Sequence, residues 1–477
     1  MTTLIWLRED LRLADNPALR AAVDEKHPVL LLYVLDEALP ERWRMGGAQR
    51  WWLHHSLSAL GADIEKAGGR LILRRGDPRE HVPDVVRAAG ARTVRWNRRY
   101  LPFDRETDDA VEAALDGIEV ETAPGSLLYE PGTITTGSGG PYKVFSPYYK
   151  ALKAKCEPRE PLPRVTKMSA PDADVDSDDL DDWALLPTKP NWAAGWEDIW
   201  RPGEAGARAR LEDWLDRNAA RYADERNRAD LDTTSRLSPH LHFGEVSPQT
   251  VWHAVRHRVD AGDIPADQAD GFLSEVAWRD FSYGVLHAFP QMLEKPYDQR
   301  FDAFPYEKPN GQLDAWKRGR TGYPIVDAGM RQLWQTGFMH NRVRMIVASF
   351  LVKDLLIDYN EGIDYFWDTL VCADAANNTA SWQWIAGTGV DASPYFRVFN
   401  PVGQGEKFDP QGDYVKRWVP ELEGLPKKYV HKPWEAPEAV LKKAGVTLGE
   451  TYPRPIVEHA KQRDEALARY KKMKEAA

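Results

Sequence analysis

The sequence predicts two domains of different fold class, an N-terminal α/β domain with a parallel, Rossmann-like sheet and an all-α C-terminal domain. Residues 1 to about 130 alternate short apolar runs with helical segments, which is the pattern of βαβ units around a parallel sheet. From about residue 204, apolar residues recur at helical spacing almost to the end. The chain has 477 residues, of which 43% are hydrophobic, and this length exceeds what one hydrophobic core usually serves.

Four apolar runs in the N-terminal region read as buried strands, Leu4–Leu7, Val29–Leu35, Arg70–Leu73 and Thr93–Trp96, with helices between them at Ala48–Ala67 and Pro83–Ala91. Right-handed crossovers would make these strands parallel and place helices on both faces of the sheet. A ligand would then lie at the carboxyl ends of the strands. Neither a Gly-x-Gly-x-x-Gly motif nor a phosphate-binding P-loop occurs there, so the common nucleotide fingerprints are absent.

The predicted domains are residues 1–130, the α/β domain, and residues 204–477, the helical domain, with a linker at 131–203. The linker is indicated by glycines at 137–140 and by a Pro- and Asp-rich stretch at 158–190, a composition typical of irregular connections. Helices are expected at Ala205–Asn218, Pro248–Ala261, Gln268–His287, Ile325–Thr336, Asn341–Ile357, Ile363–Leu370 and from Pro455 to about Lys474.

The net charge, the cysteine content and the apolar runs of the chain argue against several classes of protein. The net charge is -10, so any contact with nucleic acid must come from a local basic patch. The only cysteines are Cys156 and Cys372, which makes a disulfide framework and a Cys-based zinc site unlikely and fits the reducing cytoplasm. No basic start with a long apolar region marks a signal peptide, and no run of 18 apolar residues predicts a membrane span.

The most informative tract is Asn377–Trp384, which reads as one helix with two indoles and two amides. Asn378 and Trp382 are four positions apart and share a face, whereas Trp384 points to a nearly opposite face. An ordinary core helix would use Leu, Ile or Val, which leave no indole N–H to satisfy. The tract therefore favours a site for a large planar cofactor on one face and for a second ligand on the other.

Two further segments combine groups suited to a ligand. Hydroxyls and backbone N–H groups in Thr233–Ser238, with Arg236, suit phosphate oxygens, although an ordinary helix cap explains them as well. Glu275, Trp278 and Arg279 occupy one helical face at i, i+3 and i+4. They form either a pocket wall, in which Trp278 stacks on a base and Glu275 hydrogen-bonds it, or a surface ion pair above a packed indole.

The Met339–Met345 segment places an amide, a soft apolar side chain and arginines on one helix. A helix with a basic, solvated face is the alternative interpretation. His340 has no partner at metal-ligand spacing, so a structural role is favoured and no metal site is predicted. Further along, Asp374 suits a ribose hydroxyl or a pair with Arg344, and Arg397 suits a phosphate.

Together these segments resemble the photolyase/cryptochrome family, most closely the class I cyclobutane-pyrimidine-dimer DNA photolyases. The matching segments follow the family's order over nearly the whole chain. They are Trp6–Arg12 with Asp15–Leu19, Thr234–Pro239, Glu275–Phe281, Thr321–Ala328, Met339–Met345 and Asn377–Pro401.

The resemblance implies light-driven DNA repair in a helical domain that binds FAD. Reduced FAD would transfer an electron to a flipped-out cyclobutane pyrimidine dimer and split it into two pyrimidines. Glu275, Asn378 and Trp382 would be the catalytic residues, with Asn378 near flavin N5. The implied FAD-binding residues are Tyr222, Thr234, Ser235, Arg236, Leu237, Ser238, Glu275, Arg279, Asn341, Arg344, Cys372, Ala373, Asp374 and Asn378. The implied lesion- and DNA-binding residues are Trp278, Asn341, Arg342, Met345, Trp384 and Arg397.

The sequence departs from the family in its electron relay. Trp382 matches the tryptophan nearest the flavin, but Tyr359 and Tyr306 stand at the middle and outer positions. A tyrosine releases a proton on oxidation, which predicts a weakened relay or one rerouted through Trp384 and Trp316. Cys372 stands where an aspartate is common.

Other expectations also follow from the resemblance. A second, antenna chromophore is implied in the N-terminal domain, a folate, a deazaflavin or a flavin, between candidate walls at Arg44–Leu53 and Trp96–Arg105. The partner would be UV-damaged DNA, single or double stranded, bound by a cytoplasmic, nucleoid-associated monomer. Three alternatives stay open: a cryptochrome-like photoreceptor, a (6-4) photolyase and a flavin-free DNA-binding scaffold. Plant-type cryptochromes carry aspartate at the place of Asn378, and a (6-4) photolyase would show a histidine pair where this chain has His340-Asn341.

Overall fold

A computed structural model describes residues 2–155, 157–391 and 396–476. Cys156 lies outside the described residues. Residues 392–395, which belong to the predicted Asn377–Pro401 segment, also lie outside them. The chain forms two compact units that interleave along the sequence. Unit 1 contains Met1–Ala223, Ser235–Pro290 and Val371–Ala376, and unit 2 contains Asp224–Thr234, Gln291–Leu370 and Asn377–Ala477. The domain boundaries at 130 and 203 stay a prediction.

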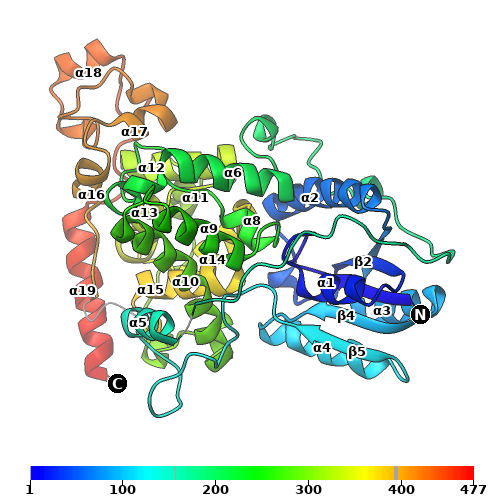
Figure 1. Cartoon of the computed structure of the whole chain (residues 1–477). Coiled ribbons are helices and arrows are strands. Elements are labelled where there is room, and N and C mark those ends of the chain that lie inside the picture. The colour runs from blue at the N-terminus through cyan, green and yellow to red at the C-terminus, as the bar shows by residue number, and fades with distance from the viewer. Residues whose placement is uncertain (1, 156, 392–395, 477) are drawn as a thin grey trace. The chain divides into compact units, whose positions relative to one another are not determined.

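Unit 1 contains a parallel five-stranded sheet, drawn in blue and cyan in Figure 1, with strand order β3-β2-β1-β4-β5. The strands are β1 (Thr2–Leu7), β2 (Val29–Asp36), β3 (Leu71–Gly76), β4 (Ala91–Asn97) and β5 (Glu119–Ala123). The predicted α/β class with a parallel sheet is therefore confirmed. β5 was not predicted, because most of its side chains are exposed and it shows no apolar run.

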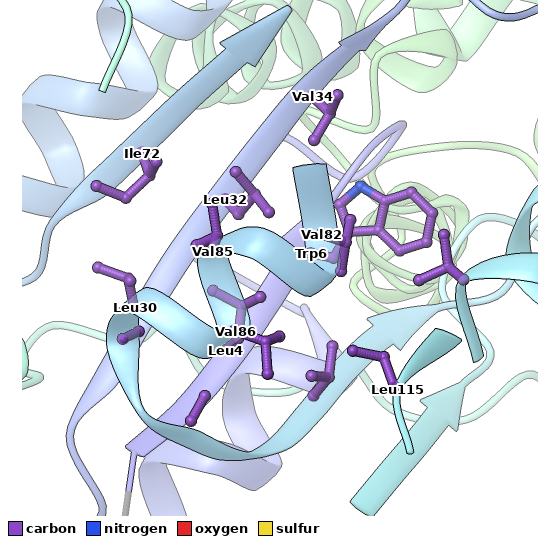
Figure 2. Close-up of a cluster of buried hydrophobic side chains, with 14 of the residues drawn as sticks. Leu4, Trp6, Leu30, Leu32, Val34, Ile72, Val82, Val85, Val86 and Leu115 are labelled. Carbon is purple, nitrogen blue, oxygen red and sulfur yellow. The ribbon is translucent and has the colours of Figure 1, made fainter. Parts of the chain in front are cut away.

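The hydrophobic core of the sheet explains why the strands are apolar almost throughout. Leu4, Trp6, Leu30 and Leu32 point to one face, where they meet Val82, Val85 and Val86 of α3, which spans Pro78–Ala89 (Figure 2). Alternate residues such as Ile5 and Leu31 point to the other face and are also fully buried. Both faces are thus covered, as expected for a parallel sheet.

Two helices in the sheet region begin at a polar cap followed by proline. Asn16 accepts a hydrogen bond from the amide of Leu19 and precedes α1 (Pro17–Asp24), and Asp77 caps α3 (Pro78–Ala89), since a side-chain oxygen satisfies an otherwise unpaired N–H group. The predicted helix at Pro83–Ala91 was therefore placed too late, and Ala91 belongs to β4. Around the sheet also lie α2 (Gly47–Lys66) and α4 (Pro102–Ala114).

Outside the sheet region, unit 1 contains further helices and the largely irregular segment 157–203. α5 (Phe145–Lys155) lies within the stretch predicted to be a linker. The other helices are α6 (Glu204–Arg217), α8 (Ser238–His242), α9 (Pro248–Asp260) and α10 (Ala266–Ala288), and α7 (Tyr222–Glu225) runs from unit 1 into unit 2. The predictions for α6, α9 and α10 are confirmed to within two residues at each end.

Unit 2 is all-α, as predicted for the C-terminal region. Its helices are α11 (Gly311–Lys317), α12 (Pro324–Thr336), α13 (Asn341–Ser349), α14 (Tyr359–Thr369), α16 (Pro401–Phe408), α17 (Asp413–Trp418), α18 (Glu438–Ala444) and α19 (His459–Ala476), and α15 (Ala375–Ala386) runs into it from unit 1. The helix predicted at Asn341–Ile357 instead changes to a π-helix at Phe350–Asp354. No helix in the described parts of the chain is long and apolar enough to cross a membrane.

Candidate functional site

The predicted site residues fall in both units, and each group is described within its own unit. In unit 1 they come from the start of α7, from Ser235–Ser238 at the start of α8, from α10 and from the segment that leads into α15. In unit 2 they come from α11, α13, α14, α15 and the segment that follows α15, together with Thr234 and Tyr306. No group of three or more potential metal ligands occurs among the described residues.

A buried polar cluster forms around Asp374 in unit 1. Its Oδ2 accepts a hydrogen bond from Nη1 of Arg279 at 3.0 Å and from the Tyr283 hydroxyl at 2.9 Å. Nδ1 of His242 lies 3.8 Å from the same oxygen. All four side chains are buried, and burial, followed by the charge of Asp374, raises the pKa of Tyr283 well above its usual value. The cluster therefore keeps a neutral phenol beside a paired carboxylate.

Two nitrogen atoms of this cluster are suited to an added ligand. Nη2 of Arg279 and Nδ1 of His242 are buried and have no hydrogen-bond partner in the described structure. A buried donor without a partner costs about 1–3 kcal/mol, so such groups point to a ligand that completes them. Oxygen atoms of a nucleotide cofactor fit this need, since a guanidinium binds phosphate and hydroxyl oxygens well. The cluster thus fits the predicted FAD.

The turn before α8 holds a second predicted group. Arg236 has φ of 53°, a left-handed conformation that non-glycine residues adopt rarely and that often marks a functional site. Oγ of Ser235 accepts a hydrogen bond from the amide of Leu237 at 3.4 Å, and the carbonyl of Ser235 accepts one from Nε of Arg210 at 2.7 Å. This turn leads directly into α8 (Ser238–His242).

Glu275 and Trp278 lie on α10, on the side of the helix that also carries Arg279. The surface-pair interpretation would join Glu275 to Arg279, but Arg279 is buried and forms an ion pair with Asp374 at 3.0 Å. Trp278 is partly exposed, and its ring stacks on Phe145 of α5 with centroids 3.8 Å apart and an interplanar angle of 9°. The pocket-wall interpretation agrees with both observations.

Other predicted residues of unit 1 pack in its core. Tyr222 makes T-shaped ring contacts with Trp214 and Phe272. These contacts pack its ring among other aromatic side chains. Cys372 is buried and not in a disulfide, and Ala373 beside it is fully buried. The candidate antenna wall at Trp96–Arg105 is occupied by ion pairs of the protein, for example Arg99 with Asp104 at 2.8 Å.

In unit 2, α15 presents two predicted residues to α14. Nδ2 of Asn378 donates to the carbonyl of Ile363 at 3.1 Å, which fixes the orientation of the amide. Trp382 is buried beside Phe366 of α14, with ring centroids 5.0 Å apart. Trp384 is partly exposed. Asn378 and Trp382 thus pack on the same neighbouring helix, as their spacing predicts.

The predicted electron relay lies in unit 2 as well. Trp316 makes a T-shaped contact with Trp382 at 6.4 Å, and its indole donates to the carbonyl of Val347 at 3.0 Å. Tyr359 begins α14 and is buried. Burial raises the pKa of Tyr306 well above its usual value, and the nearby Asp358 and Tyr359 add to this rise. If Tyr306 lost an electron in the relay, the oxidised side chain would therefore lie near the carboxylate of Asp358.

α13 carries the remaining polar group. His340 caps the helix, because its Nδ1 accepts from the amide of Arg342 at 3.2 Å, in line with the structural role predicted for it. Nε of Arg344 donates to the carbonyl of Met339 at 2.8 Å. Asn341 and Met345 belong to the same helix and are exposed and partly exposed, respectively.

Three arginines make part of unit 2 electropositive. Nη2 of Arg342 donates to Oδ1 of Asn227 at 2.8 Å, and its guanidinium lies over the Phe408 ring. Burial lowers the pKa of Arg342, and the positive charges of Arg226 and Arg397 lower it further. Arg397 is exposed. Concentrated positive charge of this kind suits nucleic-acid phosphates.

Sequence reasoning missed Tyr283, His242 and Phe145. Tyr283 stands four positions after Arg279 on α10, so helical spacing was a usable signal for it. His242 and Phe145 gave no local signal, since both meet their partners across more than a hundred residues of sequence.

Family models match two parts of the chain. The model described as the FAD binding domain of DNA photolyase matches residues 272–472, and the model described as DNA photolyase matches residues 3–167. The predicted FAD cofactor is confirmed by the first match. The all-α C-terminal half and the parallel N-terminal sheet agree with the same two models.

Known proteins resemble the chain over its whole length. The deoxyribodipyrimidine photo-lyase of Agrobacterium fabrum is 51% identical over 99% of this chain and 98% of its own length. Cryptochrome-1 of Arabidopsis thaliana is 37% identical over 98% of this chain and 69% of its own length. A solved bacterial class III photolyase from Agrobacterium tumefaciens has a TM-score of 0.96 at 51% identity and covers 99% of this chain and 98% of that chain. An archaeal photolyase from Sulfolobus tokodaii, described with two FAD molecules, has a TM-score of 0.82 at 30% identity. The match covers 99% of this chain and 100% of that chain.

Proposed function

Because the chain belongs to the photolyase/cryptochrome family, we propose that it is a DNA photolyase that splits cyclobutane pyrimidine dimers in light. One observation carries the proposal. The single helix α10 presents Trp278, with a partly exposed indole, and Arg279, which is tied to Asp374 in the buried cluster that fits FAD. One rigid element thus offers a stacking surface for a base and a group for the cofactor.

The subtype needs a correction. The class I subtype expected from the motifs is not confirmed, because the solved relative that is 51% identical over 99% of this chain is described as a class III photolyase. Class III therefore replaces class I in the proposal. The proposed substrate and cofactor are the same in either case.

FAD, when bound, supplies the light-driven electron that opens the cyclobutane ring, and the electron then returns. The protein holds the cofactor and sets its surroundings. Arg279 and His242 bring buried nitrogens to the cofactor oxygens, and the Ser235–Ser238 turn adds hydroxyls and backbone N–H groups. Asn378 places a fixed amide at the flavin ring. The other residues implied by the resemblance, Tyr222, Thr234, Asn341, Arg344, Cys372, Ala373 and Asp374, complete the proposed FAD set.

The lesion is recognised by stacking and by charge. Photolyases are among the enzymes that take their target base out of the duplex, and stacking of a base on an aromatic ring returns about 1–3 kcal/mol. Trp278 and Trp384 supply the rings, and Glu275 hydrogen-bonds the extruded dimer. The resemblance also implies Asn341 and Met345 as lesion-binding residues, and Arg342 and Arg397 as residues that hold the DNA backbone.

Electrons for recharging the cofactor pass through Trp382. The ring contact between Trp382 and Trp316 at 6.4 Å supports a branch through Trp316, whereas Tyr359 and Tyr306 form the branch at the positions of the usual relay. Trp384 is a further candidate. Trp316→Phe slows flavin photoreduction if the first branch dominates. The rerouted path is wrong if Trp316→Phe photoreduces normally while Tyr359→Phe does not.

Several parts of the proposal rest on the resemblance alone. An antenna chromophore, a folate, a deazaflavin or a second flavin, is proposed in the N-terminal region. The protein is proposed to act as a cytoplasmic monomer on UV-damaged DNA, single or double stranded. A light-harvesting role for a second FAD has been described for the Sulfolobus tokodaii relative.

A second function, that of a blue-light photoreceptor, is favoured by the 37% identity with Arabidopsis cryptochrome-1. Repair is preferred because Asn378 stands where plant-type cryptochromes carry aspartate. The decisive assay mixes fully reduced protein with oligothymidylate that contains dimers, under blue light. Recovery of thymine absorbance supports repair, and no recovery overturns it. Glu275→Ala should keep FAD but repair fewer dimers per absorbed photon.

A further inference from the structure

α5 docks on α10 through a stack of aromatic rings. Phe145 lies face to face with Trp278, with centroids 3.8 Å apart and planes 9° apart. On the same helix, Tyr149 is also near-parallel to Phe145, at 5.7 Å and 9°. Three rings from two segments, far apart in the sequence, therefore share nearly one orientation. The contact belongs entirely to unit 1.

Trp278 has one ring face covered by a stacked aromatic ring and no ring stacked on the other face among the described residues. Phe145 covers the first face. Phe281 meets the indole almost at a right angle, at 5.4 Å and 85°, so it contacts an edge and does not stack. Within the described residues, no other ring contact of Trp278 is present, and the side chain is partly exposed. A planar base can therefore stack on the side opposite Phe145.

A polar clamp holds α5 in this position. The Tyr149 hydroxyl donates to Oδ1 of Asp270 at 2.7 Å, and Nζ of Lys153 lies 2.9 Å from the same oxygen. Tyr149 and Lys153 are four positions apart and share a face of α5, while Asp270 precedes Trp278 on α10. The ring stack and the clamp thus fix α5 to α10 at two places.

We propose that Phe145 is a positioning residue for lesion recognition, which holds the Trp278 indole so that a pyrimidine dimer stacks on its free face. The inference rests on the proposed function. An indole that is already oriented loses less rotational freedom when the base arrives, and this preorganisation raises affinity. Phe145 itself does not touch the DNA.

The test compares three variants of the FAD-containing protein in the dark. Phe145→Leu removes the ring but keeps an apolar side chain, and Phe145→Tyr keeps the ring. Tyr148→Leu is the control, because Tyr148 is a buried aromatic residue of α5 whose ring lies 5.3 Å from that of Phe281 and 6.4 Å from that of Phe145 and makes no ring contact with Trp278 in the described structure. Each is titrated with oligothymidylate that contains one dimer and with the undamaged oligonucleotide.

Phe145→Leu should bind the dimer about 3- to 10-fold more weakly. This fold-change corresponds to the free energy of one aromatic ring contact. Affinity for undamaged DNA and flavin content should not change, and repair at saturating DNA should stay near normal while KM rises. Phe145→Tyr should restore binding, and Tyr148→Leu should resemble the parent. Wild-type affinity in Phe145→Leu would overturn the proposal.

A second measurement keeps this proposal separate from the proposed function. Protein labelled with 5-fluorotryptophan gives a fluorine resonance for Trp278, which is assigned by its loss in Trp278→Phe. Phe145→Leu should shift and broaden this resonance without any DNA present. An unchanged resonance would overturn the positioning role even if the protein repairs dimers. A shifted resonance in a protein that never prefers dimer DNA would overturn the proposed function instead.

Discussion

Gly362 of α14 packs against the indole of Trp382, and Gly362→Ala tests how tightly that indole is held. A Cβ at this position would lie 2.1 Å from Cη2 and 2.5 Å from Cζ2 and Cζ3 of Trp382. Carbon atoms pack at about 3.5–4.0 Å, so the indole would have to move by roughly 1.5 Å. Trp382 is 2% exposed and is bounded by Phe366 and Trp316, so little space is free for this shift.

The expected change in stability combines two opposing effects. Overpacking a core costs about 1–3 kcal/mol, while alanine in place of glycine inside a helix gains about 1 kcal/mol. Gly284→Ala in α10 is the matched control, because nothing lies within 4 Å of a Cβ there and only the gain remains. Gly362→Ala should therefore unfold with a free energy about 1–3 kcal/mol below that of the control.

Urea denaturation of both variants measures this difference, and flavin photoreduction under blue light measures its functional consequence. A displaced Trp382 should slow photoreduction in Gly362→Ala and leave it normal in Gly284→Ala. Equal stabilisation of both variants, with equal photoreduction, would show that the indole is loosely packed. That result would refute the reasoning from the Gly362 contact.

Three further predictions concern other buried groups. Tyr452→Phe removes the hydroxyl that donates to Asp327 at 2.7 Å. The variant should have a free energy of unfolding lower by about 1–3 kcal/mol and an unchanged flavin content. An unchanged free energy of unfolding in urea denaturation would contradict this prediction. Burial raises the pKa of Asp280 to about 7, so the folded chain keeps a proton that the unfolded chain releases near pH 4. Stability should therefore fall as the pH rises from about 4 to 7, by roughly 1.4 kcal/mol per unit of pKa difference, and Asp280→Asn should flatten this fall; an identical pH profile would count against it. Asp374→Asn weakens the charged hydrogen bond to Arg279. The amount of FAD bound per protein, measured by flavin absorbance, should fall several-fold. If the variant keeps its full FAD content, Asp374 does not belong to the proposed cofactor-binding residues.

Local spacing predicted the elements of this chain well where one face or both faces are apolar. The strands at Leu4–Leu7 and Val29–Leu35 were found as continuous apolar runs, and the helix at Pro248–Ala261 was found because its apolar residues recur at helical spacing. β5 was missed because this largely exposed strand has no apolar run. The π-helix at Phe350–Asp354 was missed because its residues continue the apolar pattern of α13 without a break.

The contacts of the candidate residues were harder to predict from the sequence than their positions on helices. Asn378 and Trp382 could be placed on one face from helical spacing, and both pack on α14. The partner of Arg279 could not be found this way. Helical spacing offered Glu275 four positions earlier, but the structure pairs Arg279 with Asp374, 95 positions away.

Local patterns along the chain were enough to predict the type of most elements and the family. Periodicity and motif order are local properties of the chain, so they can be read without coordinates. The contacts of Asp374 with Arg279 and Tyr283, and the stacking of Phe145 on Trp278, could be found only in the folded chain. Such pairs form because packed surfaces bring distant segments together, and the free energy of that packing depends on shape and burial across the whole unit.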